Sequence, residues 1–122
     1  MRTNRKLRKF VRNLFREAFK RIDPNFHILV DFHIQRITGK EIDELLIEEP
    51  WEFDKAFKEI FGEFGMSVIL DTVSQILLDK YGISVPSEDL YAWFKREGSD
   101  RERIRELILE LATRKIEEKG AL

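Results

Sequence analysis

The sequence of 122 residues contains no cysteine, only three prolines and only six glycines. Without cysteine, disulfide scaffolds, thiolate zinc sites and cysteine nucleophiles are excluded, and a reducing cytoplasm is the natural setting. No apolar run approaches the roughly 20 residues that a membrane-spanning helix needs, and the first residues show no hydrophobic signal-peptide region. We therefore expect a cytoplasmic protein without a membrane span.

Side-chain amides are scarce as well, whereas charged residues are abundant. The amides are Asn4, Asn13, Asn25, Gln35 and Gln75. Charged residues make up 37% of the chain, and its 22 basic residues nearly balance its 23 acidic ones. A low content of thermolabile amides beside many charges is typical of heat-adapted proteins. The near-zero net charge also excludes a polycation that would bind nucleic acid over its whole surface.

Hydrophobic residues make up 43% of the chain, which is too apolar for a disordered protein and enough for one compact core. Most of them recur at steps of three and four, the spacing of amphipathic helices. We therefore predict a single all-α domain over residues 1–122, a compact bundle of six to seven helices in which residues 1–22 form a basic amphipathic helix. The expected helices are 3–22, 26–37, 41–46, 51–61, 66–81, 87–96 and a last one from Ser99 onwards. The expected core residues are Phe10, Phe15, Phe57, Val73, Leu77, Trp93, Leu107 and Leu111.

Turn and capping residues separate these helices. Asp23-Pro24-Asn25 ends the first helix, because proline cannot continue one. Pro50 opens a later helix, and Gly62 and Gly65 form a tight corner after it. Further caps are expected at Gly39, Gly82 and Ser87 and in the capping box of residues 99–102.

Residues 26–37 fit two kinds of secondary structure. Apolar residues alternate with less apolar neighbours there, as in a strand. Read as a helix, the segment places Val30 and Ile34 on one face and Ile28 and Phe32 on the opposite face, and a helix that is apolar on two sides is a buried one. No second convincing strand exists, and a lone strand leaves its backbone groups unsatisfied. We therefore predict a central helix that is buried on both sides.

The clearest asymmetry in charge lies at the N-terminus, where seven basic residues precede the first acidic one, Glu17. Cations in the first turn of a helix oppose its macrodipole, and a broken local rule often marks a function. The candidate binding residues are Arg5, Lys6, Arg8, Lys9, Arg12 and Arg16. If about five of them contacted the phosphates of nucleic acid, log affinity would fall against log salt with a slope of about −4 to −5, and anionic lipid is a second possible ligand. The alternatives are a solvated face and a face that pairs with acidic residues elsewhere.

An acidic block without an intervening base supplies partners for such pairing. It consists of Glu41, Asp43, Glu44, Glu48, Glu49, Glu52 and Asp54. Most of these residues lie at or before helix starts, where carboxylates are favourable, so helix stability explains them without a further function. A second hypothesis is that the basic helix of one subunit docks on the acidic block of another.

No motif points to catalysis or to a bound metal. His27, Asp31 and His33 do not share one helical face, whereas a metal site needs three ligands together, so partly buried histidines with satisfied hydrogen bonds explain them. The chain has no glycine-rich phosphate loop, no nucleophile elbow and no HExxH motif. We therefore expect no enzyme activity, no metal and no cofactor.

Residues 31–83 resemble a known family. The segment contains the runs DFHIQRITG and PWEFDKAFKEIFGEFG and then a helix that ends in DKYGI. It is similar to the Nitrosopumilus output domain family, a small archaeal all-helical family with stand-alone relatives. The matching positions are Pro50, Phe53, Ala56, Phe57, Phe61, Gly62 and Gly82. Two departures are Glu63-Phe64-Gly65, where the family has a small-residue turn, and the two helices expected beyond Ile83.

The resemblance implies an all-helical signalling or regulatory output module without assigned catalysis. Our first functional hypothesis is therefore a non-enzymatic regulatory or interaction module that binds protein partners, a second copy of itself included. The second hypothesis is a protein that binds nucleic acid or another anionic surface through the basic N-terminal helix.

Overall fold

The structure, a computed structural model, describes residues 2–95, 103, 106–107 and 110. Within these residues it contains five α-helices, one short 3₁₀-helix and no strand, which confirms the all-α prediction. The elements are α1 (Arg2–Ile22), α2 (Phe26–Thr38), α3 (Ile42–Glu48), α4 (Pro50–Tyr81), α5 (Ser87–Tyr91) and η1 (Ala92–Phe94). The predicted capping box at 99–102 and the core position Leu111 lie outside the described residues.

Helix α1 forms because its apolar residues make one continuous stripe. The buried members of this stripe are Leu7, Val11, Leu14, Phe15, Ala18 and Phe19. Lys20 and Arg21 lie in the last turn, where cations interact favourably with the helix dipole. The helix ends at Ile22, and Asp23 then accepts a hydrogen bond from the backbone N–H of Asn25 at 2.8 Å. The predicted stop is therefore confirmed.

Helix α4 consists of two helical segments that meet at a bend. Gly62 lies at the bend with φ 78° and ψ 174°, a conformation that a side chain would strain. Gly65 has a different reason, because a Cβ atom there would lie 2.8 Å from the Cβ of Phe61. The two helices predicted on either side of this corner are thus one bent element, which is one reason why the helix count is lower than expected.

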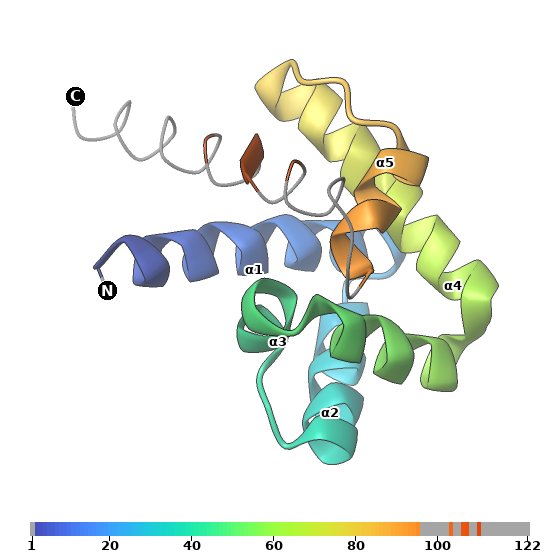
Figure 1. The fold of residues 1–122 in the computed structure, drawn as a ribbon. Coiled ribbons are helices and arrows are strands. Elements are labelled where there is room, and N and C mark those ends of the chain that lie inside the picture. Colours follow the sequence, from blue (N-terminus) through green and yellow to red (C-terminus); the bar gives the residue numbers. More distant parts are fainter. Residues whose placement is uncertain (1, 96–102, 104–105, 108–109, 111–122) are drawn as a thin grey trace.

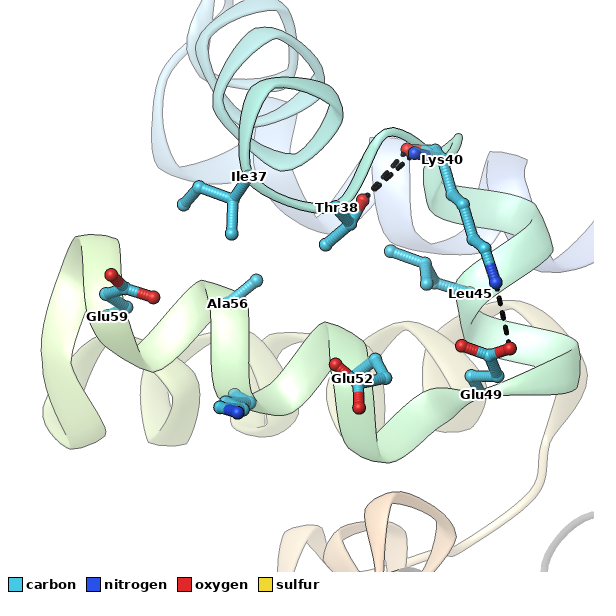
Figure 2. A pocket seen from close by; sticks show the side chains of 9 residues that line it. Ile37, Thr38, Lys40, Leu45, Glu49, Glu52, Ala56 and Glu59 are labelled. Atoms are coloured by element: carbon cyan, nitrogen blue, oxygen red, sulfur yellow. Dashed lines mark hydrogen bonds and ion pairs between the residues drawn. The ribbon is translucent and has the colours of Figure 1, made fainter.

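The α2–α3 turn is tied to the junction between α3 and α4. The ammonium group of Lys40, just after α2, donates a hydrogen bond to the Glu49 carboxylate at 2.9 Å (Figure 2). Pro50 is the first residue of α4, where its missing N–H costs nothing. This bond brings the end of α2 close to the start of α4. The opposite side of α2 takes no part in this contact.

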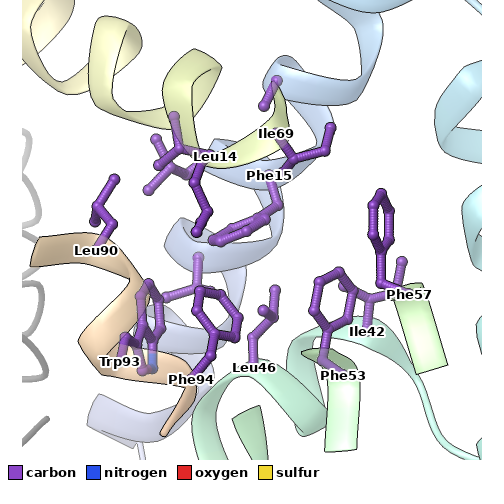
Figure 3. Packing of buried hydrophobic residues seen from close by; sticks show 14 of the residues in the cluster. Leu14, Phe15, Ile42, Leu46, Phe53, Phe57, Ile69, Leu90, Trp93 and Phe94 are labelled. Carbon is purple, nitrogen blue, oxygen red and sulfur yellow. The ribbon is translucent and has the colours of Figure 1, made fainter. Parts of the chain in front are cut away.

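Phe15 of α1 lies at the centre of the core (Figure 3). Its ring makes edge-to-face contacts with Phe53, Trp93 and Phe94 at centroid distances of 6.1, 5.8 and 6.2 Å. Of the predicted core residues, Phe15, Phe57, Val73, Leu77 and Trp93 are buried, whereas Phe10 and Leu107 are only partly buried. One aromatic cluster therefore joins α1, α4 and η1.

The short helix α5 is shorter than predicted. The α-helix ends at Tyr91 rather than near residue 96, and Ala92, Trp93 and Phe94 form a turn of 3₁₀-helix. Ser87 is the first helical residue and makes no side-chain cap, so its predicted capping role is wrong. The tighter 3₁₀ turn places Ala92, Trp93 and Phe94 together in the core, which explains why the α-helical pattern stops there.

Helix α1 crosses the molecule and contacts α2, α3 and α4 (Figure 1). Helix α2 packs against α1, α3 and α4 and lies at the end of the molecule away from α5 (Figure 1). These neighbours contact α2 on its inner side, and its outer side faces away from them.

Candidate functional site

Helix α2 has one face in the core and one face in solvent. Val30 and Ile34 are fully buried, whereas Ile28 is 59%, Leu29 45% and Phe32 62% exposed. The prediction of a helix here is confirmed, but the prediction that both of its sides are buried is wrong. Among the described residues, the neighbouring helices cover only the face of Val30 and Ile34. We call Ile28, Leu29 and Phe32 the α2 ridge.

A shallow groove of about 660 Å³ lies along the α2 ridge. Besides the ridge, its lining consists of Asp23, Asn25 and Phe26. Three large apolar side chains on one exposed helix face form the kind of patch that marks an interaction site on a protein surface. The arrangement can bind an apolar surface of another molecule.

Charged groups flank the α2 ridge at both ends. Asp23 lines the groove before α2 begins, and Arg36 lies one helical turn beyond Phe32 on the same face. The Arg36 guanidinium lies 3.4 Å from Nδ1 of His33. Within the part of the chain that the structure describes, neither Asp23 nor Arg36 forms an ion pair. Among the described residues, the ridge thus has an acid without an ion-pair partner at one end and a base without a carboxylate partner at the other.

The basic helix α1 uses part of its charge inside the molecule. Arg8 Nε lies 3.1 Å and Arg12 Nη2 lies 3.2 Å from the same carboxylate oxygen, Oδ2 of Asp43. The side chain of Asp43 is only 3% exposed, while those of the two arginines are each 38% exposed. We call Arg8, Arg12 and Asp43 the ion cluster. The two guanidinium groups offset the cost of burying the carboxylate, and their removal would leave an uncompensated buried charge that destabilises the fold.

Arg16 also faces a carboxylate, because its Nη2 lies 3.3 Å from Oδ2 of Asp31 in α2. Of the six candidate binding residues, Arg8, Arg12 and Arg16 are therefore paired within the chain. Arg5 and Lys9 are exposed, and the side chain of Lys6 lies outside the described residues. For half of the candidate set, the structure thus shows the alternative in which the basic face pairs with acidic residues elsewhere in the chain. One of these partners, Asp43, belongs to the acidic block.

A second depression, of about 370 Å³, lies between the end of α2, α3 and the start of α4 (Figure 2). Its rim bears carboxylates of the acidic block beside Lys40 and Lys55. The hydrogen bond to Glu49 raises the pKa of Lys40, against a smaller opposing effect of desolvation. Paired and solvated charges of both signs make this depression a polar surface feature rather than a selective site.

The two histidines and Asp31 are not brought together. Asp31 pairs with Arg16, and His33 contacts Arg36. His27 buries its Nδ1 without a hydrogen-bond partner among the described residues, so the interpretation of satisfied histidines is wrong for this one. In the same part of the chain, no group of three or more His, Cys, Asp or Glu side chains is placed to bind a metal ion.

Helix α4 is the one described helix that is long and apolar enough to cross a membrane by length and composition alone. It bends at Gly62, and ten of its side chains are buried, among them Phe53, Met66 and Leu77. Length and composition are weak grounds for a membrane span, since core helices of soluble proteins also meet them.

The profile of one family matches residues 5–89, from the first turns of α1 into α5. The family is Nitrosopumilus output domain 5. This chain belongs to that family. The match confirms the resemblance found over residues 31–83 and extends it over α1, so both the ion cluster and the α2 ridge lie within the family domain. Neither the curated proteins nor the solved structures include a match to the chain.

The α2 ridge was not among the site residues expected for this Nitrosopumilus output domain 5 member. Its signal is nevertheless present in the sequence, as the second apolar face of residues 26–37. In the sequence, a second apolar face indicates that the helix is buried within its own chain. Only the packing of α2 shows that this face is exposed.

Proposed function

We propose that this protein is a non-enzymatic interaction module that acts by binding a protein partner on the α2 ridge. The single observation behind this proposal is the exposure of Ile28, Leu29 and Phe32 on one helix face. Fully burying an exposed side chain of this kind is worth about 1.5–3 kcal/mol, so each of these half-exposed residues would contribute roughly half of that, before the costs of association. Three such side chains are a reasonable anchor for a specific complex.

The family assignment supports the same proposal. The family is described as an output domain, a description that fits a module acting through contact with another molecule. At the ion cluster, the other conspicuous feature, the charges already pair with one another within the chain. The α2 ridge, by contrast, exposes apolar side chains that a partner could bury.

Binding of phosphate by α1 is the competing proposal. It is supported by the exposure of Arg5 and Lys9, whereas Arg8, Arg12 and Arg16 would have to leave or share their carboxylates. Duplex DNA titrated over a series of salt concentrations tests it. A steep salt dependence that R5Q/K9Q reduces would support phosphate binding, and no DNA binding at low salt would exclude it for duplex DNA.

Photo-crosslinking tests the partner proposal directly. We expect benzoylphenylalanine in place of Phe32 to form protein adducts in an extract of the source cells, because the side chain at this position contacts the partner. The same crosslinker in place of Leu78, which is 50% exposed on α4, is the matched control. Adducts at position 32 but not at position 78 support the proposal. Equal yields at both positions, or none at position 32, would overturn it.

A further inference from the structure

We propose that the partner on the α2 ridge is a second copy of this chain, docked so that the two α2 helices lie antiparallel about a twofold axis. This inference rests on the proposed function and adds the identity and orientation of the partner. It starts from the two apolar faces of α2, a pattern typical of helices that are buried all round. In one chain, the described residues bury only one of these faces. A second copy would bury the other.

The order of residues along the ridge suits a twofold contact. In such a contact the same patch is used twice, so a residue on one side of the axis meets its counterpart on the other side. With the axis on the exposed face of α2, level with the midpoint between Ile28 and Phe32, Ile28 of each copy would meet Phe32 of the other, and Leu29 would lie close to the axis. Large side chains would thus oppose each other along the whole ridge.

The charges at the ends of the ridge show the same symmetry. Arg36 lies six residues after Val30, and Asp23 lies seven residues before it. Arg36 lies in the last turn of α2, about 9 Å along the helix from the level of Val30 at a rise of about 1.5 Å per residue, and Asp23 lies in the turn just before the other end of α2. An antiparallel pair therefore places Asp23 of each copy beside Arg36 of the other, whereas a parallel pair would place like charges together. Both charges lack an ion-pair partner among the described residues, so they are available for this contact.

The charge of the whole chain favours this occupant over an anionic surface. The formal net charge is −1, so two copies repel each other very little. An anionic membrane or a nucleic acid would be attracted by Arg36 at one end of the ridge but repelled by Asp23 at the other. A second copy could pair with both charges.

Sedimentation equilibrium of the purified chain over a series of concentrations is the first test. We expect a reversible dimer for the wild type and a dissociation constant at least about tenfold higher for F32D, which inserts a charge at the centre of the contact. Phe32 is exposed, so the variant should keep its fold, which thermal melting by circular dichroism verifies. The matched control is L78D on α4, where Leu78 is 50% exposed and the dimer should be unchanged. A wild type that remains monomeric, or equal effects of F32D and L78D, would overturn the proposal.

Charge exchange at the ends of the ridge tests the orientation. Because each single substitution places like charges together at both ends, D23R and R36D should each raise the dissociation constant by about threefold to tenfold. An equimolar mixture of the two variants should dimerise as well as the wild type, because each altered end then meets an opposite charge. The double variant D23R/R36D should recover as well. Dimerisation of the single variants at wild-type strength, or no recovery on mixing, would overturn the antiparallel arrangement.

The outcome of this test is distinguishable from that of the proposed function. If the purified chain is monomeric but the crosslinker at position 32 captures a different protein, the ridge is an interaction site and the second copy is not its partner. If the crosslinker captures nothing and the chain is monomeric, both proposals fail. An adduct of twice the mass of the chain, together with the concentration-dependent dimer, supports both.

Discussion

The ion cluster and the α2 ridge are opposite exceptions to the usual division between an apolar interior and a polar surface. In the ion cluster, the charged side chain of Asp43 is only 3% exposed and has two guanidinium partners within 3.2 Å. In the α2 ridge, the aromatic side chain of Phe32 is 62% exposed. Three of the conspicuous cations of α1, Arg8, Arg12 and Arg16, are thus paired with carboxylates of the same chain, whereas the less conspicuous second apolar face of α2 is exposed.

Truncation of the two faces of α2, one at a time, should give the largest difference in stability. We expect I34A, on the fully buried face, to lower the free energy of unfolding by about 2–5 kcal/mol through the cavity that it leaves. I28A, on the exposed ridge, should change it by less than about 0.5 kcal/mol. Urea denaturation of dilute samples, below the concentration at which copies associate, measures both. A large loss for I28A in dilute solution would mean that the ridge is covered within one chain.

The ion cluster gives the next largest expected effect. The double variant R8Q/R12Q should lower the free energy of unfolding by about 2–3 kcal/mol, because it leaves a buried carboxylate without its charged partners. D43N should lower it less, since no buried charge remains. R5Q/K9Q is the control with equal loss of positive charge, and it should be neutral because both residues are exposed. Equal losses in the two double variants would show that α1 does not depend on Asp43 for its packing.

The smallest expected effect concerns Asp54, a partly buried carboxylate outside both regions. Burial raises its pKa, and this outweighs the opposing effect of Lys58, whose Nζ lies 3.3 Å away. A carboxyl group whose pKa is raised on folding weakens the fold where it is ionised, and this cost disappears as the pH falls through the raised pKa. D54N should therefore be slightly more stable than the wild type near neutral pH, and the difference should vanish in acid.

Urea denaturation of the wild type and D54N, near neutral pH and in acid, measures this difference in the free energy of unfolding. Lys58 also donates a hydrogen bond to the hydroxyl of Tyr91, a group that D54N does not change, so we expect the comparison to report mainly on the carboxyl group. A variant that is less stable near neutral pH would show that the attraction to Lys58 exceeds the cost of burial. Asp54 would then behave like Asp43, as a charge that the fold uses.

Much of the fold could be predicted from local features. The stripe of α1, the stop at Asp23 and the left-handed glycines after α2 and α4 depend on residues that are close in sequence. Spacing also showed correctly that residues 26–37 have two apolar faces. It could not show which face meets the core, because that depends on the positions of the other helices.

Local patterns in the sequence predict most of the helices, the ends of α1, α2 and α4, and an acidic block that can neutralise a basic helix, because periodicity and capping act within a few residues. The pairing of Arg8 with Asp43, a residue 35 positions away, and the exposure of Phe32 to solvent follow from how the helices pack and could not be predicted from local patterns. The physical reason is that burial and ion pairing are properties of neighbours in space. The same kind of apolar face is core where another helix covers it and exposed surface where none does.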